Sequence, residues 1–270
     1  MVSLQTYTPV MLPHLVKAFW YMEVGHDSAF YEEEIVPDGH NEIIIYLNDT
    51  SARKGHPEDE WAIQPDAFIA GQTLKGHKVK MFAGARLYGI RFYPHTSYPF
   101  LKTPLYHMAD GVFSLSEVLN TEGLWSCITD VPKQTFENLE RWLCEKISFK
   151  TLNDQGYKYV SHLTGHILKN NGMLNMDSIK HTWDISDKYY GDLFKKYVGI
   201  TPKHLCNIVK INHFISNKIH HPDLNLTECT YESGYYDQSH LIKSFHQFTG
   251  TSPRKYFEDE HQVSNMFSEL

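Results

Sequence analysis

The sequence lacks the features of a membrane or secreted protein. Its 270 residues contain no apolar run approaching the ~18 residues that a membrane-spanning helix needs. The first residues, MVSLQTYTPVML, have neither a basic segment nor a long apolar segment, so they do not resemble a secretory signal. The four cysteines are scattered without a Cys-x-x-Cys pair, which leaves no sign of a disulfide framework or a zinc knuckle. We therefore expect a reduced, cytoplasmic protein without a membrane partner.

Signatures of catalysis are missing as well. The sequence has no glycine-rich phosphate loop, no nucleophile elbow and no kinase signature. We therefore expect no enzymatic activity, no catalytic residues and no cofactor.

The length and the charge distribution indicate two regions of different character. A chain of 270 residues exceeds the usual size of one domain. The net charge is −7, but residues 156–257 contain 12 Lys and Arg against 8 Asp and Glu, so this part is positive by 4 and the remainder is negative by 11. This asymmetry indicates an acidic partner for the C-terminal part alone.

Residues 12–104 contain short segments rich in β-branched and aromatic residues. Turn signals such as Pro37-Asp38-Gly39 and Gly71 separate these segments. Regularly spaced short strands without an intervening helical pattern favour a β-sandwich or a small barrel. A barrel of this size can hold one small ligand.

The pattern changes to helix from residue 114 onward. Pro132 begins a segment in which Phe136, Leu139, Leu143 and Ile147 form one apolar face. Such a helix either packs on its own barrel or pairs with its copy in a second subunit. Residues 153–156 have the character of a linker.

The C-terminal part contains two similar segments that lie about fifty residues apart. Residues 175–202 and 225–253 each show a polar cap, a short helix, a tight turn, a longer helix and a Gly-x-x-Pro ending. Between the copies, residues 203–220 form an unbroken helical pattern, ~27 Å long at 1.5 Å per residue. That length could hold two helices near one turn of DNA apart, ~34 Å, so that one chain reaches successive major grooves.

The second copy has the pattern that a DNA-reading helix needs. Leu241, Phe245 and Phe248 recur at i, i+4 and i+7, so they form one buried face. The polar residues at the start of the helix then lie on other faces, as in the second helix of a helix-turn-helix. Asn225 and Glu228 stand at capping-box spacing ahead of the shorter helix.

With this duplicated arrangement the sequence resembles the AraC/XylS family of bacterial transcription regulators. The resemblance covers residues 157–258, and its most specific positions are Gly199-Ile200-Thr201-Pro202 with Gly234, Asp237, Ser239, Phe245, Gly250 and Pro253. The N-terminal part resembles a cupin-like sensor domain in Trp20, Pro37-Asp38-Gly39, Glu42, Gly71-Gln72 and residues 89–94. The resemblance implies promoter binding and control of transcription, with double-stranded promoter DNA, a small-molecule effector, a second copy of the chain and RNA polymerase as partners.

The expected fold is α+β with two domains. Residues 1–112 form a cupin-like β-barrel or sandwich with flanking helices, and residues 113–155 form a helical linker or dimerisation region. Residues 156–260 form an all-α domain with two helix-turn-helix units joined by a long helix, and residues 261–270 form a tail.

The resemblance also assigns contact residues. They are Gln238, Ser239, His240 and Lys243 in the second unit and Ser186, Lys188 and Tyr189 in the first. Beyond these, we expect the first unit to act largely through Lys195, Lys196 and its shape, and Arg254 and Lys255 at the last helix either contact phosphate or are solvated. Gln can pair bidentately with adenine, whereas Ser and His are more permissive.

Several positions depart from the family pattern. Lys243 stands where Arg is usual, which replaces a bidentate guanine contact with a looser point charge. In the first unit Gly191 and Asp192 depart from the pattern, and a carboxylate at 192 would repel phosphate. Lys180 occupies a small buried position, and Asp184 replaces a turn glycine. We therefore expect the second unit to carry most of the sequence specificity.

The N-terminal residues permit two interpretations. Trp20, Tyr46, Phe68, Arg91 and Phe92 either line an effector pocket, where Arg91 would favour an anionic or polar ligand, or pack a core. A metal-dependent cupin-type enzyme with an appended helical domain is one alternative function, and a regulator with a degenerate first unit and weak DNA binding is another. A cupin metal centre needs His-x-His, which the sequence lacks, so His40, His77 and His95 are expected to be structural or surface residues and no metal is expected.

Overall fold

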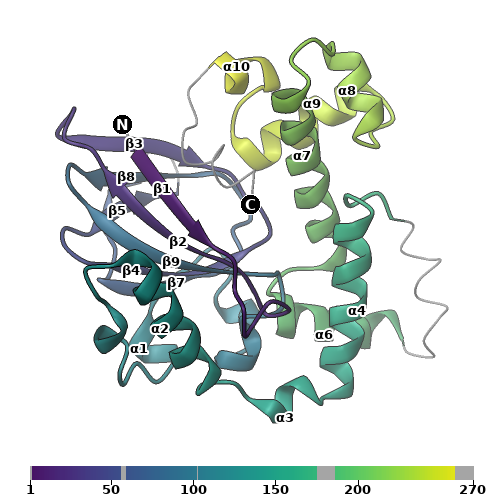
Figure 1. Cartoon of the computed structure of the whole chain (residues 1–270). Helices are drawn as coiled ribbons and strands as arrows, with labels where there is room; N and C mark the ends of the chain where they lie inside the picture. The colour runs from purple at the N-terminus through teal and green to yellow at the C-terminus, as the bar shows by residue number, and fades with distance from the viewer. Residues whose placement is uncertain (1, 56–58, 102, 175–185, 259–270) are drawn as a thin grey trace.

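A β-rich N-terminal half precedes a helical C-terminal half (Figure 1). The computed structural model describes residues 2–55, 59–101, 103–174 and 186–258. Its strands are β1 Val2–Tyr7, β2 Val16–Val24, β3 Phe30–Ile35, β4 Asn41–Tyr46, β5 Ser51–Lys54, β6 Ala62–Ile63, β7 Ala67–Ala70, β8 His77–Phe82, β9 Arg86–Phe92 and β10 Val112–Ser114.

The strands form two antiparallel sheets. The six-stranded sheet has the order β1-β2-β9-β4-β7-β10, and the four-stranded sheet has the order β3-β8-β5-β6. Because successive side chains of a strand point to opposite faces, Trp20 and Met22 of β2 lie in a core between the sheets. Phe19 and Tyr21 of the same strand pack on the outer face. The six-stranded sheet is therefore buried on both faces.

Helix α2, Pro132–Cys144, covers the outer face of the six-stranded sheet together with α1, Leu115–Val118. Phe136 of α2 stacks on Tyr7 with ring centroids 5.6 Å apart and meets the ring of Tyr88 edge-on. Of the two expectations for this apolar face, the structure has the one in which the helix packs on the β-rich part of its own chain. Three short 3-10 helices, η1 Tyr98–Phe100, η2 Leu105–His107 and η3 Trp125–Cys127, complete this region.

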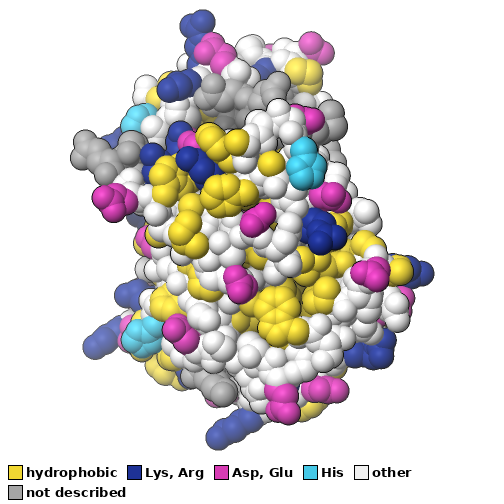
Figure 2. Space-filling view, turned by 90° about the vertical axis from the view of Figure 1, so that its left-hand side faces the viewer, with side chains coloured by type: hydrophobic (Ala, Val, Ile, Leu, Met, Phe, Trp, Pro, Cys, Tyr) yellow, Lys and Arg dark blue, Asp and Glu magenta, His cyan; other side chains and the backbone are white. Residues whose placement is uncertain are grey.

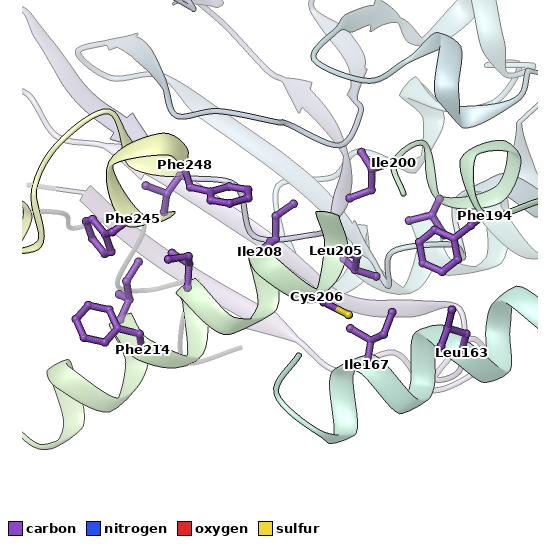
Figure 3. Close-up of a cluster of buried hydrophobic side chains, with 14 of the residues drawn as sticks. Leu163, Ile167, Phe194, Ile200, Leu205, Cys206, Ile208, Phe214, Phe245 and Phe248 are labelled. Atoms are coloured by element: carbon purple, nitrogen blue, oxygen red, sulfur yellow. The ribbon is translucent and has the colours of Figure 1, made fainter. Parts of the chain in front are cut away.

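The remaining helices form a second core around the long helix α7 (Figure 3). Phe214 of α7 lies against Phe245, with ring centroids 5.7 Å apart, whereas Leu205 and Cys206 lie nearer to α4. The helices are α3 Phe149–Leu152, α4 Gln155–Lys169, α6 Asp187–Val198, α7 Pro202–His220, α8 Leu226–Glu232, α9 Gln238–Thr249 and α10 Pro253–Glu258.

The predicted α+β class, with a β-rich N-terminal part and a helical C-terminal part, is confirmed, and so is the long helix α7. Strand β1 was not predicted, although its six residues all pair with β2. Lys180 and Asp184 lie outside the described residues. No helix within the described ranges is both long enough and apolar enough to cross a membrane.

The surface mixes apolar and charged side chains. On the side of the molecule that lies at the left of Figure 1, hydrophobic side chains gather in several clusters among scattered acidic and basic ones (Figure 2). Neither sign of charge covers this face as a whole.

Candidate nucleic-acid interface and ligand cavity

Helix α6 stands where the sequence predicts the first recognition helix, and it has a defined start and end. The Ser186 hydroxyl accepts a hydrogen bond from the backbone N–H of Tyr189 at 3.3 Å, and Gly199 ends the helix at a φ of 97°. A left-handed backbone at this position favours glycine, and it satisfies the last turn of the helix. The predicted contact residues Ser186, Lys188, Tyr189 and Lys195 are all exposed, as is Asp192.

The second recognition helix, α9, is built in the same way. The Asp237 carboxylate accepts from the backbone N–H of His240 at 2.7 Å, and Gly250 ends the helix at a φ of 75°. Leu241, Phe245 and Phe248 are 0%, 0% and 2% exposed, which confirms the predicted buried face.

On the polar face of α9, some side chains are exposed and one is hydrogen-bonded to α8. Ser239, His240 and Lys243 are exposed. Gln238 is half-buried, and its side-chain amide donates to the Thr227 hydroxyl of α8, so reading a base would require this contact to break. Tyr236, which is 86% exposed just before the helix, was missed because an aromatic residue in a turn is usually assigned to packing.

A reciprocal cap fixes the start of the shorter helix α8. The Asn225 side chain accepts from the backbone N–H of Glu228, and the Glu228 carboxylate accepts from the backbone N–H of Asn225. This confirms the predicted capping box. A left-handed Gly234, at a φ of 73°, then turns the chain towards α9.

The other predicted basic contacts differ in their availability. Arg254 and Lys255 are exposed on α10, although Arg254 forms an ion pair with Glu258 at 3.0 Å. Lys196 is half-buried, and its Nζ atom lies 5.8 Å and 4.7 Å from the ring centroids of Tyr98 and Tyr197. Lys195 is therefore the better placed of the two neighbouring lysines for a phosphate contact.

A cavity of about 240 Å³ lies between the two sheets. Four of the five predicted pocket residues, Trp20, Tyr46, Phe68 and Arg91, line it. Phe92 does not, because it follows Arg91 on β9 and therefore faces the opposite side, where its ring centroid is 5.4 Å from that of Phe100. The assignment of Phe92 to the pocket is wrong.

Arg91 is the centre of a charged cluster in the cavity wall. Its guanidinium forms ion pairs with Asp38 and, at 2.6 Å, with Glu42, whose carboxylate also accepts from the Trp20 indole at 3.4 Å. Burial raises the pKa of Glu42, with Arg91 opposing the shift. At Asp38 burial is the largest effect and acts in the same direction, but the charges and hydrogen bonds of Arg91 and His40 together outweigh it, so the pKa is lowered. Because two carboxylates neutralise Arg91, the expected preference for an anionic ligand does not follow from this residue.

Sequence reasoning missed Lys17, which also lines the cavity. Its Nζ atom is 3.1 Å from Nε2 of His40, and Nδ1 of His40 is 2.8 Å from the backbone oxygen of Phe92. Burial, with the charges of Arg91 and Lys17, holds the pKa of His40 well below its usual range. No sequence signal indicates Lys17, since it owes its direction to a bulge in β2.

The helical half closes one side of the cavity. Asn212, Ile215 and Ser216 of α7 and Tyr256 of α10 are among the lining residues. The Asn212 amide donates to the backbone oxygen of Pro37 at 2.8 Å. The loop that carries Asp38 thus touches α7 as well as Arg91.

The three histidines considered as metal ligands do not form one group. His40 and His77 line the cavity, whereas His95 packs against Tyr157 of α4 with ring centroids 5.4 Å apart. Burial lowers the pKa of His77 to about 3 and that of His95 to about 4. Among the residues that the structure describes, no three His, Cys, Asp or Glu side chains are placed to hold a metal ion together.

Each half of the chain matches a known protein-domain family. Residues 182–259 match a helix-turn-helix domain family, and residues 5–114 match a domain of unknown function (DUF6597). With the two capped helices and the long connecting helix, the first match defines a DNA-binding transcription regulator. This helix-turn-helix domain is of the AraC type, in agreement with the resemblance of residues 157–258 to the AraC/XylS regulators.

Solved structures of ToxT from Vibrio cholerae are also similar to the chain. One covers 86% of this chain and 98% of its own at 9% identity and a TM-score of 0.45. Another, bound to (E)-4-(8-methylnaphthalen-1-yl)but-3-enoic acid, covers 86% and 99% at 8% identity and a TM-score of 0.47. A third, bound to an unsaturated fatty acid, covers 85% and 95% at 11% identity and a TM-score of 0.42. No curated protein in the comparison matches the chain.

Proposed function

We propose that the chain regulates transcription by placing α9 and α6 in successive major grooves of promoter DNA, under the control of a small molecule in the barrel, and that it catalyses no reaction. The observation that carries this proposal is the pair of capped helices, each with a buried stripe and an exposed polar start, at either end of α7. The 19 residues of α7 span ~28 Å, which is close to the spacing of adjacent grooves.

Within this proposal α9 reads most of the sequence. Ser239 and His240 are exposed at its start, where a recognition helix meets base edges, and Lys243 supplies a phosphate or guanine contact one turn later. Gln238 joins them once its bond to Thr227 opens. The helix α6 contributes mainly through Lys188 and Lys195, since Asp192 repels the phosphate backbone.

The cavity is the proposed effector site. Its volume of about 240 Å³ lies below the ~300–1,000 Å³ of sites for drug-sized ligands, so the effector is small. A ligand bound in the cavity acts on the DNA-binding half through two contacts. Helices α7 and α10 form part of the cavity wall, and the Asn212 amide of α7 donates a hydrogen bond to the Pro37 carbonyl.

The proposed boundaries are residues 1–112 for the sensor, 113–155 for the linking helices, 156–260 for the DNA-binding domain and 261–270 for the tail. The apolar face of α2 is occupied by its own barrel, so a second copy would bind through another surface. Binding at a promoter would bring the chain beside RNA polymerase.

Selection of bound sites from a random double-stranded DNA pool tests the proposal. We expect an enriched site with two unequal halves about one helical turn apart, and binding that weakens steeply with salt. Lys243→Ala should reduce the affinity for this site, whereas Lys133→Ala, on the barrel-covering helix α2, should leave it unchanged. The proposal fails if the purified full chain enriches no sequence at low salt.

A further inference from the structure

Lys17 faces the cavity because of an irregularity in β2. Val16 pairs with Phe92 and Ala18 with Arg91, so one residue of β2 stands opposite no residue of β9. This bulge inverts the alternation of the strand, with Val16 in the outer core and Lys17 in the wall of the cavity. In a regular strand the lysine would point to the apolar outer face, where its charge would have no partner.

The contacts around Lys17 fix the direction of its amine. The backbone oxygen of Phe92 can only accept, so Nδ1 of His40 carries the hydrogen and Nε2 presents a lone pair. The Lys17 amine donates to that lone pair at 3.1 Å. One N–H is therefore used, and the rest of the nitrogen faces the cavity.

The charged groups that face Lys17 are those of the Arg91 cluster. Burial, followed by the positive charge of Arg91, lowers the pKa of Lys17 from 10.5 to about 8, and the carboxylates of Asp38 and Glu42 oppose this shift. An amine with this pKa is unprotonated in a much larger fraction of molecules near neutral pH than a solvated lysine. Desolvated lysines of this kind are the ones that attack carbonyl groups.

We infer that Lys17 forms an imine with an aldehyde or ketone that enters the cavity. This inference rests on the proposed role of the cavity as the effector site. The Nζ lone pair adds to the carbonyl carbon, and the carbinolamine loses water. The neutral amine that attacks has two hydrogens; one leaves with the carbonyl oxygen as part of the water, and the other hydrogen of the water is the proton that the ammonium form released. The product is the protonated imine, in which the nitrogen keeps one hydrogen and one positive charge.

The surroundings suit that product as well as the free amine. The remaining N–H of the iminium can keep the hydrogen bond to Nε2 of His40, and its charge stays next to Asp38 and Glu42. The substituent of the carbonyl compound would lie against the apolar wall of Trp20 and Ile44. A small aldehyde with an apolar chain is therefore the ligand class that this end of the cavity fits.

The test uses butanal and sodium borohydride on the full chain without DNA, followed by peptide mass spectrometry. We expect the reduced adduct at Lys17 to form at least about tenfold faster at pH 7.5 than the adduct at the exposed Lys243 of the same molecule. The yield at Lys17 should reach half of its maximum near pH 8, and Lys17→Met should remove this fast adduct alone.

The wild-type protein decides the result, so a folding defect in the variant cannot obscure it. Equal rates at Lys17 and Lys243, or a Lys17 profile that rises only above pH 10, would overturn the inference. Because the labelling needs no DNA, this result is independent of the site-selection experiment, which tests the proposed function by itself.

Discussion

The recognition helices α6 and α9 share their buried positions and differ in their exposed ones. Ser186 and Asp237, which cap the two helices, lie 51 residues apart, and the same offset relates the buried Tyr190 to Leu241, Phe194 to Phe245, Tyr197 to Phe248, and Gly199 to Gly250. Packing requires an apolar side chain at each of the buried positions and a left-handed residue at the end. The two copies therefore keep the same internal framework.

The exposed side chains at the same offset have different chemistry. Lys188 corresponds to Ser239, Tyr189 to His240, and Asp192 to Lys243. Nothing in the protein interior constrains these positions, so the two units present different donors, acceptors and charges to a partner. Under the proposed function, this difference predicts two half-sites of unequal sequence, with the stronger contact made by α9.

The largest expected effect tests the shared scaffold. Phe194→Ala and Phe245→Ala each remove a fully buried ring, so each should lower the free energy of unfolding by about 3–5 kcal/mol. Urea denaturation followed by circular dichroism measures the loss. The exposed Tyr189→Ala and His240→Ala serve as controls and should stay within about 0.5 kcal/mol of the parent. A much smaller loss in one phenylalanine variant would show that the two units are not packed alike.

The stability of the contact between the β-rich half and helix α4 should depend on pH. His95 packs on Tyr157 of α4, and burial lowers its pKa from the ordinary value of 6.5 to about 4 in the folded protein. Because the unfolded chain binds the proton more readily, this contribution is complete above pH 6.5 and is lost as the pH falls towards about 4. It amounts to about 3 kcal/mol over that window.

The stability of the wild type relative to His95→Gln should therefore fall as the pH decreases from 6.5 to 4. Urea titrations of both proteins across this range measure the difference. His204, beside Phe248 of the second unit, also has a pKa lowered by burial, but it is present in both proteins and cancels. A difference that stays constant with pH would contradict the assignment of His95.

The sequence predicted the shared scaffold better than the cavity. Apolar spacing and caps such as Asn225 with Glu228 are local, so the helices of the second unit and the long helix α7 could be predicted from the chain alone. Strand β1 has few apolar residues and owes its existence to pairing with β2, a contact that local pattern does not reveal.

The pocket residues illustrate the same limit. Trp20 and Phe92 both lie on strands of one sheet, yet only Trp20 faces the cavity, because the direction of a side chain depends on its parity and on bulges. Lys17 could not be found for this reason. The pairing of Arg91 with Asp38 and Glu42 likewise joins residues about fifty positions apart.

Gly199 and Gly250, the glycines that end α6 and α9, should differ in their tolerance of alanine. Both have a positive φ, which costs a non-glycine residue about 1–2 kcal/mol. A Cβ at Gly199 would also meet the backbone oxygen of Leu105 at 3.0 Å, whereas at Gly250 the nearest atom is a Glu34 carboxylate oxygen at 3.5 Å. Gly199→Ala should therefore lower the free energy of unfolding by about 2 kcal/mol and Gly250→Ala by about 1 kcal/mol. Equal losses would mean that Leu105 moves aside without cost.

Removing the basic side chain of Lys243 tests whether the exposed residues of α9 contact DNA more strongly than those of α6. Lys243→Ala should weaken binding to the selected site by about 1 kcal/mol, roughly fivefold, and reduce the slope of log K against log salt by about 0.9. Fluorescence anisotropy at several salt concentrations measures both quantities. An unchanged slope would assign Lys243 to a surface that DNA does not touch.

A substitution at the corresponding position of α6, Asp192, should strengthen DNA binding, and its effect should be smaller than that of Lys243→Ala. Asp192→Lys places a cation where α9 has Lys243, on a helix with the same kind of cap and the same buried face. Removing a repulsive carboxylate and adding one phosphate contact should strengthen binding by about 0.5–1 kcal/mol and steepen the salt slope by up to about 0.9. Asp192→Asn separates the two parts, since it removes the repulsion without adding a contact. If neither variant changes the affinity, α6 does not reach the DNA, and the unequal reading of the two half-sites becomes reading by α9 alone.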